Sequence, residues 1–423
     1  MFDLGVYANS RICVAVSGGR DSMALLNFIY THMREFGITL SALNCDHKIR
    51  GEASARDSAF VAEWCKKRGI PLLQFEWDYD GTKTEQAARL WRRECYEAVL
   101  DGGADFVATA HHMDDNAETV LFNLARGSAV AGLAGITDGE KIIHPLISRT
   151  REEIDAYIAD NGIEYVDDET NFSDGYTRNK IRHNVLPELE KAVHGALGNI
   201  YRLSRLAAED EKYFESVIEE RKILRFTPFG AEISLCESVI FKRAAVKAVK
   251  YFNRKDYTAE HLQNLYQLAC GEKNRKFEFL GLTAYGGGSK IVITPKGDGG
   301  AEIPFNQYAG DNFCGQKLII CSSAQDNGKV LRFDSDAVPD NAVIRFRRDG
   351  DRFKKFGGGT KSLGDYFTDK KIPLWVRDKV PLIAVDSEVL AVCGVEISDR
   401  IKVGENTEKI ALIYSFDYTA DNI

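Results

Sequence analysis

The chain has 423 residues, 44% of them hydrophobic and 28% charged, and its formal net charge is −8. This length predicts two or three domains, and the lack of an apolar run of about 18 residues argues against a membrane-spanning helix. The N-terminal residues lack the basic and apolar segments of a secretion signal, and the nine cysteines form no CxxC pair. We therefore expect a cytoplasmic protein with reduced thiols and no zinc or iron–sulfur site.

The first part of the chain alternates short apolar runs with amphipathic helical runs. Strands are predicted at residues 12–16, 40–45, 71–75 and 105–109, and helices at 23–36, 54–68, 85–100 and 115–125. This alternation is typical of α/β proteins with a doubly wound, mostly parallel sheet. Ligands of such sheets bind beyond the carboxyl ends of the strands.

The rest of the chain is predicted to be helical at first and then rich in short strands. Helices are expected within 186–221, 241–252 and 259–268, and strands within 277–294 and from 343 onward. We predict three domains: an α/β catalytic domain over 1–205, a helical or α+β middle domain over 206–330, and a small α+β domain over 335–423.

A glycine-rich loop, Ser17-Gly-Gly-Arg-Asp-Ser22, stands between the first strand and the first helix. Glycines let the backbone approach phosphate oxygens, and a helix N-terminus offers unpaired N–H groups. The serines add hydroxyl donors, whereas Asp21 beside phosphates indicates a cation such as Mg²⁺. The loop lacks the Lys-Ser/Thr pair of a Walker motif. An ordinary turn capped by serine is the alternative.

An acidic helix start, His111-His-Met-Asp-Asp-Asn-Ala-Glu-Thr119, follows the fourth strand. Asp114, Asp115 and Glu118 fall within about one helical turn and repel one another unless a positive charge lies between them. A Mg²⁺ site, carboxylates that orient an incoming amine, and compensation of the helix dipole all stay open. His111 and His112 are either ligands or buried, capping histidines.

The segment from Arg345 to Lys379 carries eleven basic and five acidic residues, a local charge of +6. Basic side chains supply phosphate contacts, and aromatic side chains stack on unpaired bases, so RNA contact is predicted here. The alternative is a solvated basic surface over a β core. We expect most of the interleaved aromatic residues in that core; they are Phe346, Phe353, Phe356, Tyr366, Phe367 and Trp375.

Together these motifs resemble the tRNA(Ile)-lysidine synthetase family, whose SGGxDS loop is the PP-loop of N-type ATP pyrophosphatases. Further matching segments are Asn44–Arg50 (the HVDHxLR-like stretch, with Asn44 for the first histidine), Glu85–Arg89 with Arg92, Ala125–Gly127, and Thr177–Arg182 followed by Leu186-Pro187. The C-terminal matches are Arg345–Asp351, Lys361–Leu363, Lys371–Pro373 and Arg377. His144 departs from the family, because it stands where an arginine is usual.

The resemblance implies an adenine-nucleotide alpha hydrolase-like fold and a two-step reaction. ATP adenylates O2 of wobble cytidine 34 in the CAU anticodon of tRNA(Ile), and the ε-amine of free L-lysine then displaces AMP to give lysidine. It implies ATP contacts for Ser17, Gly18, Gly19, Arg20, Asp21, Ser22 and His47, with Asp21 as the Mg²⁺ ligand. It implies catalytic roles for Asp21, Arg89, Asp115, Glu118, Arg178 and Arg182, and tRNA contacts for Arg345, Arg347, Lys361, Lys371 and Arg377.

Three other functions carry less weight. A PP-loop tRNA thiolase needs catalytic cysteines or a cluster site, and no cysteine lies near His111 in the sequence. An amide-forming synthetase for a small metabolite would not need the basic C-terminal segment. A non-catalytic nucleotide-binding regulator has no use for Asp21 beside a carboxylate cluster. The lysine pocket and the oligomeric state do not follow from the sequence, and a homodimer is one option.

Overall fold

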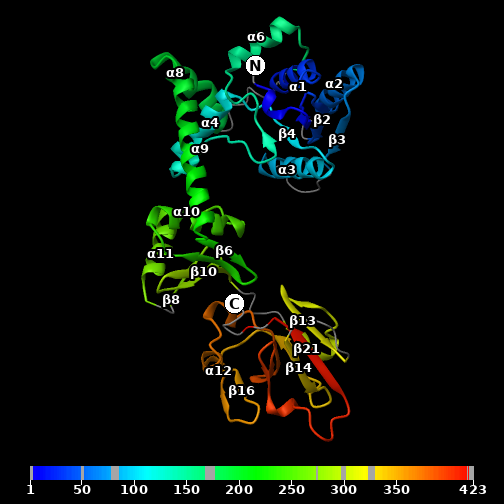
Figure 1. Ribbon diagram of the computed structural model, residues 1–423, viewed down its shortest axis with the longest axis vertical. Coiled ribbons are helices and arrows are strands. Elements are labelled where there is room, and N and C mark those ends of the chain that lie inside the picture. The colour runs from blue at the N-terminus through cyan, green and yellow to red at the C-terminus, as the bar shows by residue number, and fades with distance from the viewer. Residues whose placement is uncertain are drawn as a thin grey trace. The chain divides into compact units, whose positions relative to one another are not determined.

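The computed structural model describes residues 3–48, 52–77, 85–166, 177–272, 275–296, 302–322, 329–416 and 418. The chain divides into two compact units, Met1–Tyr213 and Phe214–Ile423 (Figure 1). Among the described residues, no helix is long and apolar enough to cross a membrane. The three-domain division stays a proposal; separate hydrophobic clusters within the second unit support it.

A five-stranded parallel sheet forms the centre of the first unit, as predicted. Its order is β3 (Leu72–Glu76), β2 (Thr39–Asp46), β1 (Arg11–Ala15), β4 (Phe106–Ala108), β5 (Ile142–Ile143). The two-residue strand β5 was not predicted, because it is too short to show a periodic pattern. The order reverses direction at β1, so the loops after β1 and β4 meet at one edge, where ligands bind in such sheets.

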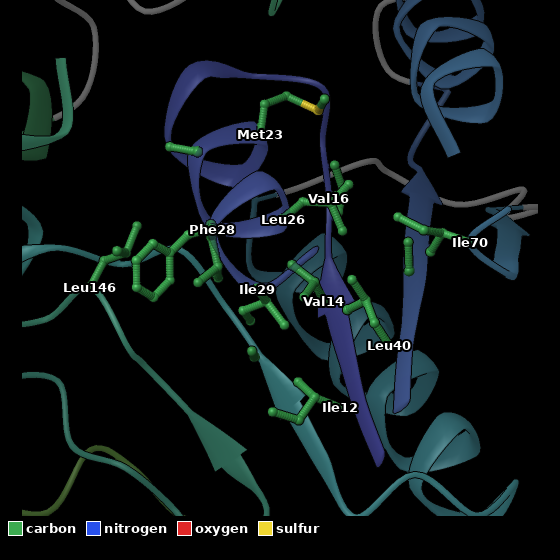
Figure 2. Close-up of a cluster of buried hydrophobic side chains, with 14 of the residues drawn as sticks. Ile12, Val14, Val16, Met23, Leu26, Phe28, Ile29, Leu40, Ile70 and Leu146 are labelled. Atoms are coloured by element: carbon green, nitrogen blue, oxygen red, sulfur yellow. The ribbon is translucent and has the colours of Figure 1, made fainter. Parts of the chain in front are cut away.

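Helices cover both faces of this sheet, which explains why β1 is apolar on successive residues. On one face lie α1 (Arg20–His32), α2 (Glu52–Arg68) and α6 (Arg151–Asn161), and on the other lies α3 (Glu85–Asp101). Helices α4 (Met113–Ala125) and α5 (Val130–Leu133) follow β4 and pack against each other. Ile12 and Val14 pack into a cluster with α1, α2 and α6 (Figure 2). Cys13 points to the other face and packs with Leu43, Val99 and Val107.

Shorter helices complete the first unit. They are η1 (Gly5–Tyr7), α7 (Thr177–Lys180), the π-helical turn η3 (Ile181–Val185) and α8 (Leu186–Ala192), and the long α9 (Ala196–Glu220) continues into the second unit. Ile181 and Leu186 pack against Ala117 of α4. This contact places the segment carrying Arg178 and Arg182 beside the acidic helix start.

The second unit opens with an antiparallel sheet and two helices. The sheet contains β6 (Leu224–Thr227), β7 (Gly230–Ser234), β10 (Lys290–Pro295), β9 (Leu282–Gly286) and β8 (Arg275–Phe279), in that order. Helices α10 (Ser238–Tyr251) and α11 (Ala259–Cys270) pack on it through a core that includes Phe241 and Leu265.

The remaining residues form a β-rich region with two short helices. One sheet contains β11 (Glu302–Pro304), β15 (Val343–Arg345), β18 (Leu382–Val385), β19 (Glu388–Val392), β16 (Arg352–Lys354), β17 (Thr360–Ser362) and β20 (Glu396–Ile397). A second contains β12 (Asn312–Phe313), β13 (Gln316–Cys321), β21 (Ile410–Ser415) and β14 (Lys329–Asp334). The helical segments are η4 (Phe305–Gln307), α12 (Leu363–Asp369), α13 (Leu374–Arg377) and η5 (Asp399–Ile401). The predicted α/β class with a small α+β end is confirmed.

Candidate active site

The loop between β1 and α1 is folded into a tight turn by its two serines. Ser22 Oγ donates to the Gly19 carbonyl at 2.8 Å, and the backbone N–H of Ser17 donates to Ser22 Oγ at 3.3 Å. The N–H of Gly19 donates back to Ser17 Oγ at 3.3 Å. Gly18 has φ +87°, in the left-handed region where a side chain would be strained. The loop is therefore a rigid cradle at the start of a helix, the geometry that binds phosphate.

Arg20 and Asp21 begin α1 and have different surroundings. The Arg20 guanidinium donates to Asp155 at 2.8 and 3.0 Å, so its charge is already balanced. Asp21 Oδ1 is buried and has no hydrogen-bond partner in the described part of the chain. A buried carboxylate oxygen without a partner beside a phosphate cradle is the kind of ligand that Mg²⁺ uses together with phosphate oxygens.

A cavity of about 640 Å³ opens beside this loop, at the carboxyl ends of β1, β2 and β4. This volume lies within the range of small-molecule sites, so a nucleotide fits. Its lining includes Ser17, Gly19, Arg20, Asp21, Ser22, Asn44, His47, Arg92, Tyr96, Thr109, His111 and Arg151. Asn44 donates to the Val16 carbonyl at 2.8 Å and so ties the end of β2 to that of β1. Asn44 replaces the family's histidine, and its Oδ1 has no hydrogen-bond partner among the described residues.

Aromatic rings surround His47 in this cavity. The His47 ring centre lies 5.1 Å from that of Trp91 and 5.9 Å from that of Trp77, and the two tryptophans stack with centres 5.7 Å apart. Of these three residues only His47 is among the described residues that line the cavity, so the tryptophans pack around it and hold its ring in place. His47 was assigned to ATP only by resemblance, and the two tryptophans around it were not predicted.

His112 joins the glycine loop to the acidic helix. Its ring is 1% exposed; Nδ1 lies 3.3 Å from Asp114 Oδ2, and Nε2 lies 3.4 Å from Asp115 Oδ2 and 3.8 Å from Asp21 Oδ2. Burial lowers the pKa of His112, but these carboxylates outweigh burial and the net shift is upward. Asp21 and Asp115 therefore lie on the same edge of the sheet, around one imidazole.

Arg182 closes the other side of the carboxylate cluster. Its guanidinium lies 2.6 Å from Asp115 Oδ1 and 2.9 Å from Glu118 Oε2, and Arg178 Nε lies 3.7 Å from Glu118 Oε1. Burial raises the pKa of Glu118, although both arginines oppose this shift. The structure thus brings together four of the six predicted catalytic residues, two acidic and two basic: Asp115, Glu118, Arg178 and Arg182.

A second cavity of about 570 Å³ lies next to the first. Its lining includes Arg89, Arg92, Tyr96, Thr109, His111, Asp115, Glu118, His144, Arg178 and Arg182. The two cavities share Arg92, Tyr96, Thr109 and His111. Arg89 is exposed on α3 at the rim of this second cavity. One cavity is lined by the phosphate cradle and the other by the carboxylates, with a common wall between them.

A metal cage made by the protein alone is not present among the described residues, since no group of three or more His, Cys, Asp or Glu side chains is arranged to hold an ion. Mg²⁺ in nucleotide sites is usually held by one or two carboxylates together with substrate phosphates. Asp21, with its unpartnered Oδ1 in the first cavity, fits that requirement.

Arg345 does not face solvent, contrary to the prediction of a tRNA contact. It is 1% exposed and donates to Asp351 at 2.7 and 2.9 Å and to the Phe346 and Asp386 carbonyls at 2.9 and 2.6 Å. A guanidinium with its NH1 and NH2 donors satisfied inside the protein holds strands together instead of binding RNA. We therefore assign Arg345 a structural role.

The other predicted tRNA-binding residues reach the surface to different degrees. Arg347 pairs with Asp378, and Lys361 lies 2.6 Å from Asp369. Arg377 donates to the Ile372 carbonyl at 2.8 Å, whereas Lys371 is exposed. Most of the aromatic residues are core, as expected; Phe353, Tyr366 and Phe367 are at most 2% exposed, and only Phe356 of the six is largely exposed.

Three site residues were not assigned a role from the sequence. For His112 the sequence left open whether it is a ligand or a buried histidine that caps the helix. Arg151, whose guanidinium lies 3.7 Å from Asp21, was not singled out in the sequence. Asp138 lies in a turn with no recognisable pattern. The adjacent histidines in the acidic motif were the one signal that could have identified His112.

Comparisons with known proteins agree with this site. Residues 3–189 match the PP-loop domain family, and residues 342–414 match the TilS substrate C-terminal domain family. The chain is similar to the tRNA(Ile)-lysidine synthase of Caldanaerobacter subterraneus subsp. tengcongensis, with 32% identity over 98% of this chain and 94% of that protein. Those of Parabacteroides distasonis and Bacillus subtilis are each 30% identical, over 95% and 96% of this chain and 94% of each relative.

These matches run over nearly the whole length of the chain and of each relative. The matched PP-loop segment contains both cavities, so sequence similarity and geometry identify the same part of the molecule. The chain belongs to the tRNA(Ile)-lysidine synthase family, and it is a ligase that forms a carbon–nitrogen bond.

Proposed function

We propose that the chain adenylates O2 of the wobble cytidine in the CAU anticodon of tRNA(Ile) and then joins C2 of that base to the ε-amine of free L-lysine. The observation that carries this proposal is the common wall of the two cavities, formed by Arg92, Tyr96, Thr109 and His111. A nucleotide in the first cavity and an amine in the second would meet at this wall, where the cytidine can be activated and then attacked.

The first cavity supplies what adenylation needs. The cradle Ser17–Ser22 would hold the phosphates through backbone and hydroxyl donors, and His47, held in place by the two tryptophans, would contact the base. Asp21 would hold Mg²⁺, which when bound neutralises charge on the pyrophosphate leaving group. Arg151, within 3.7 Å of Asp21, adds positive charge on the same side. Burial raises the pKa of Tyr96 to about 12, so its hydroxyl stays a neutral donor.

The second cavity supplies what the amine needs. Asp115 and Glu118 provide two negative charges for a lysine ammonium, and Arg182 keeps them in fixed positions through its contacts of 2.6 and 2.9 Å. Arg89 and Arg178 line the same cavity and can contact the base or a phosphate of the tRNA. When the lysine ammonium enters, it can replace part of the contact between Arg182 and the carboxylates of Asp115 and Glu118.

The C-terminal region would contact the tRNA away from the reacting base. Lys371 is exposed, and Arg347, Lys361 and Arg377 are partly exposed or paired with acidic residues at the surface. Phosphate contacts of such side chains fix the position of the RNA without reading its sequence.

Incorporation of labelled lysine into tRNA tests the proposal. The protein, Mg-ATP and labelled lysine are incubated with tRNA(Ile) bearing a CAU anticodon, and with the same tRNA carrying uridine at the wobble position. Label should appear only in the first tRNA and only with ATP. Absence of label from both, across a range of protein and magnesium concentrations, would contradict the proposal.

A further inference from the structure

His144, which stands where the family usually has an arginine, lines the second cavity and is paired with the half-exposed carboxylate of Asp138. It follows β5 directly, and its side chain is 11% exposed. Asp138 Oδ1 accepts the backbone N–H of His144 at 2.7 Å and contacts ring Nδ1 at 3.1 Å. A carboxylate can only accept, so Nδ1 carries the hydrogen and Nε2 carries the lone pair. No described residue forms a hydrogen bond with Nε2.

The Asp138 carboxylate is suited to fix this tautomer. Burial raises the pKa of Asp138, but the hydrogen bonds from the ring and backbone of His144 outweigh burial and lower it. Arg205 also faces Asp138 and donates to the Ile136 carbonyl at 2.6 Å. Burial, together with the negative charge of Asp138, raises the pKa of the nearby Tyr7 hydroxyl. Asp138 therefore stays ionised and orients the imidazole, as the third member of a nucleophile–base–carboxylate set does.

The other groups of this cavity are poor proton acceptors. His111, whose ring centre lies 5.1 Å from that of His144, is bonded to Thr109 Oγ1 at 2.9 Å. Burial lowers the pKa of His111 to about 4, an effect that His144, Arg89 and Arg92 reinforce and Asp115 opposes. A base that weak rarely takes a proton from an ammonium group.

The carboxylates of the cavity are engaged by cations. Asp115 Oδ1 and Glu118 Oε2 both contact Arg182, and Glu118 Oε1 faces Arg178. Burial raises the pKa of Glu118, but its two oxygens already face Arg182 and Arg178. The geometry therefore suits these carboxylates to hold a positive ammonium beside the arginines.

We propose that His144, oriented by Asp138, is the general base that takes a proton from the ε-ammonium of lysine. This inference rests on the proposed function. One N–H bond of the ammonium breaks and its proton moves to Nε2 of His144. The freed lone pair forms the new C–N bond at C2 of the adenylated cytidine. The C2–O2 bond breaks, and its electron pair leaves with AMP. The second proton of the attacking nitrogen passes to water, which leaves one N–H in the product.

Single-turnover kinetics of His144→Gln test the inference. Glutamine can keep a hydrogen bond to Asp138 but cannot act as a base. Adenylation of the tRNA, measured without lysine from labelled ATP, should keep the wild-type rate. Lysine transfer to the preformed adenylated tRNA should slow about 100-fold at saturating lysine, in kcat and not in KM. The defect should shrink as pH rises, because the fraction of free amine grows.

Three further variants sharpen this test. Asp138→Asn should give a smaller defect of the same pH dependence, since its amide oxygen still accepts from the backbone of His144. His144→Arg, which restores the residue usual in the family, should also lose transfer and keep adenylation. His194→Gln removes an exposed histidine and should behave as wild type.

The outcomes separate the two proposals. Wild-type transfer rates in His144→Gln or His144→Arg would overturn the inference while leaving the proposed function intact. Equal losses of adenylation and transfer, unchanged by pH, would show a merely structural role and also overturn it. A wild-type protein that forms no lysidine would overturn the proposed function, and the inference with it.

Discussion

The carboxylate–arginine cluster of the first unit and the Arg345–Asp351 pair of the second use the same residue types in opposite ways. The Arg182 side chain is 33% exposed, binds two carboxylates, and lines a cavity. Arg345 is 1% exposed, and its NH1 and NH2 groups are used inside the protein. Buried, saturated pairs hold a fold, whereas partly open pairs can exchange partners with a charged substrate. Substitutions in both regions test this distinction.

The largest effect is expected from Arg345→Met, because it leaves the Asp351 carboxylate buried without a partner. The second unit should lose about 3–5 kcal/mol of unfolding free energy. Hydrogen exchange of the amides in β15, β18 and β19, read by mass spectrometry, measures this locally. Arg347→Met, at a partly exposed pair, should cost less than about 1 kcal/mol. Equal losses of unfolding free energy in the two variants would show that the buried pair stabilises the protein no more than the exposed one.

Arg182→Gln should do the reverse, with a large kinetic effect and a small effect on stability. Because it removes the cation that holds Asp115 and Glu118, lysidine formation should slow about 100-fold. The thermal midpoint should stay near that of wild type, since the Arg182 side chain is one-third exposed and Arg178 still faces the buried Glu118 carboxylate. Arg11→Gln, which opens an exposed pair with Asp105, is the matched control and should leave activity unchanged. If Arg182→Gln lost as much stability as Arg345→Met, the two ion-pair clusters would not differ in their contribution to stability.

Acid should weaken the first unit through His111. Burial lowers its pKa from 6.5 to about 4, so as pH falls the unfolded chain takes up a proton before the folded protein does. Stability that is present above about pH 6.5 is lost as pH falls towards 4, and this residue should account for about 2 kcal/mol between pH 7 and pH 5. His111→Asn should lose less stability over that interval in urea titrations. Identical pH dependence in the two proteins would show that His111 is not buried in its neutral form.

The smallest effect is expected from the exposed lysines of the C-terminal region. Lys371→Gln should weaken tRNA binding about fivefold and reduce the slope of log K against log salt by about 1. Lys361→Gln should change both quantities less, because Lys361 is already paired with Asp369 at 2.6 Å. Equal changes in the two variants would mean that surface pairing does not decide which lysines reach the RNA.

Local patterns in the sequence were enough to predict the sheet and its glycine loop. Strand and helix alternate clearly from Ile12 to Ala125, and the loop and the acidic motif each follow a strand directly. Neighbours that come from distant parts of the chain were not predictable. Charge counting could not show that Arg345 is closed off by Asp351 and a carbonyl of Asp386, because that contact depends on how β15 and β18 pair.

The roles of the site residues divide in the same way, into those that a local motif predicts and those that depend on contacts between distant segments. Resemblance supplied Asp115, Glu118 and Arg182 as a set, and the packing of Ile181 against α4 explains why they meet. The position of His112 between Asp21 and the acidic helix start depends on two segments that meet only in the folded chain, and it has no periodic signal. The same holds for Asp138 and His144, where a turn residue and a strand end meet only in the folded chain.

Rapid-quench measurement of the adenylated tRNA in Asp115→Asn tests the division of labour between the two cavities most directly. Wild-type protein with ATP and tRNA(Ile) should accumulate this intermediate without lysine and consume it when lysine is added. The variant should form it at the wild-type rate and fail to consume it. If Asp115→Asn blocks formation of the intermediate, or consumes it as fast as wild type, adenylation and lysine transfer are not separated as described.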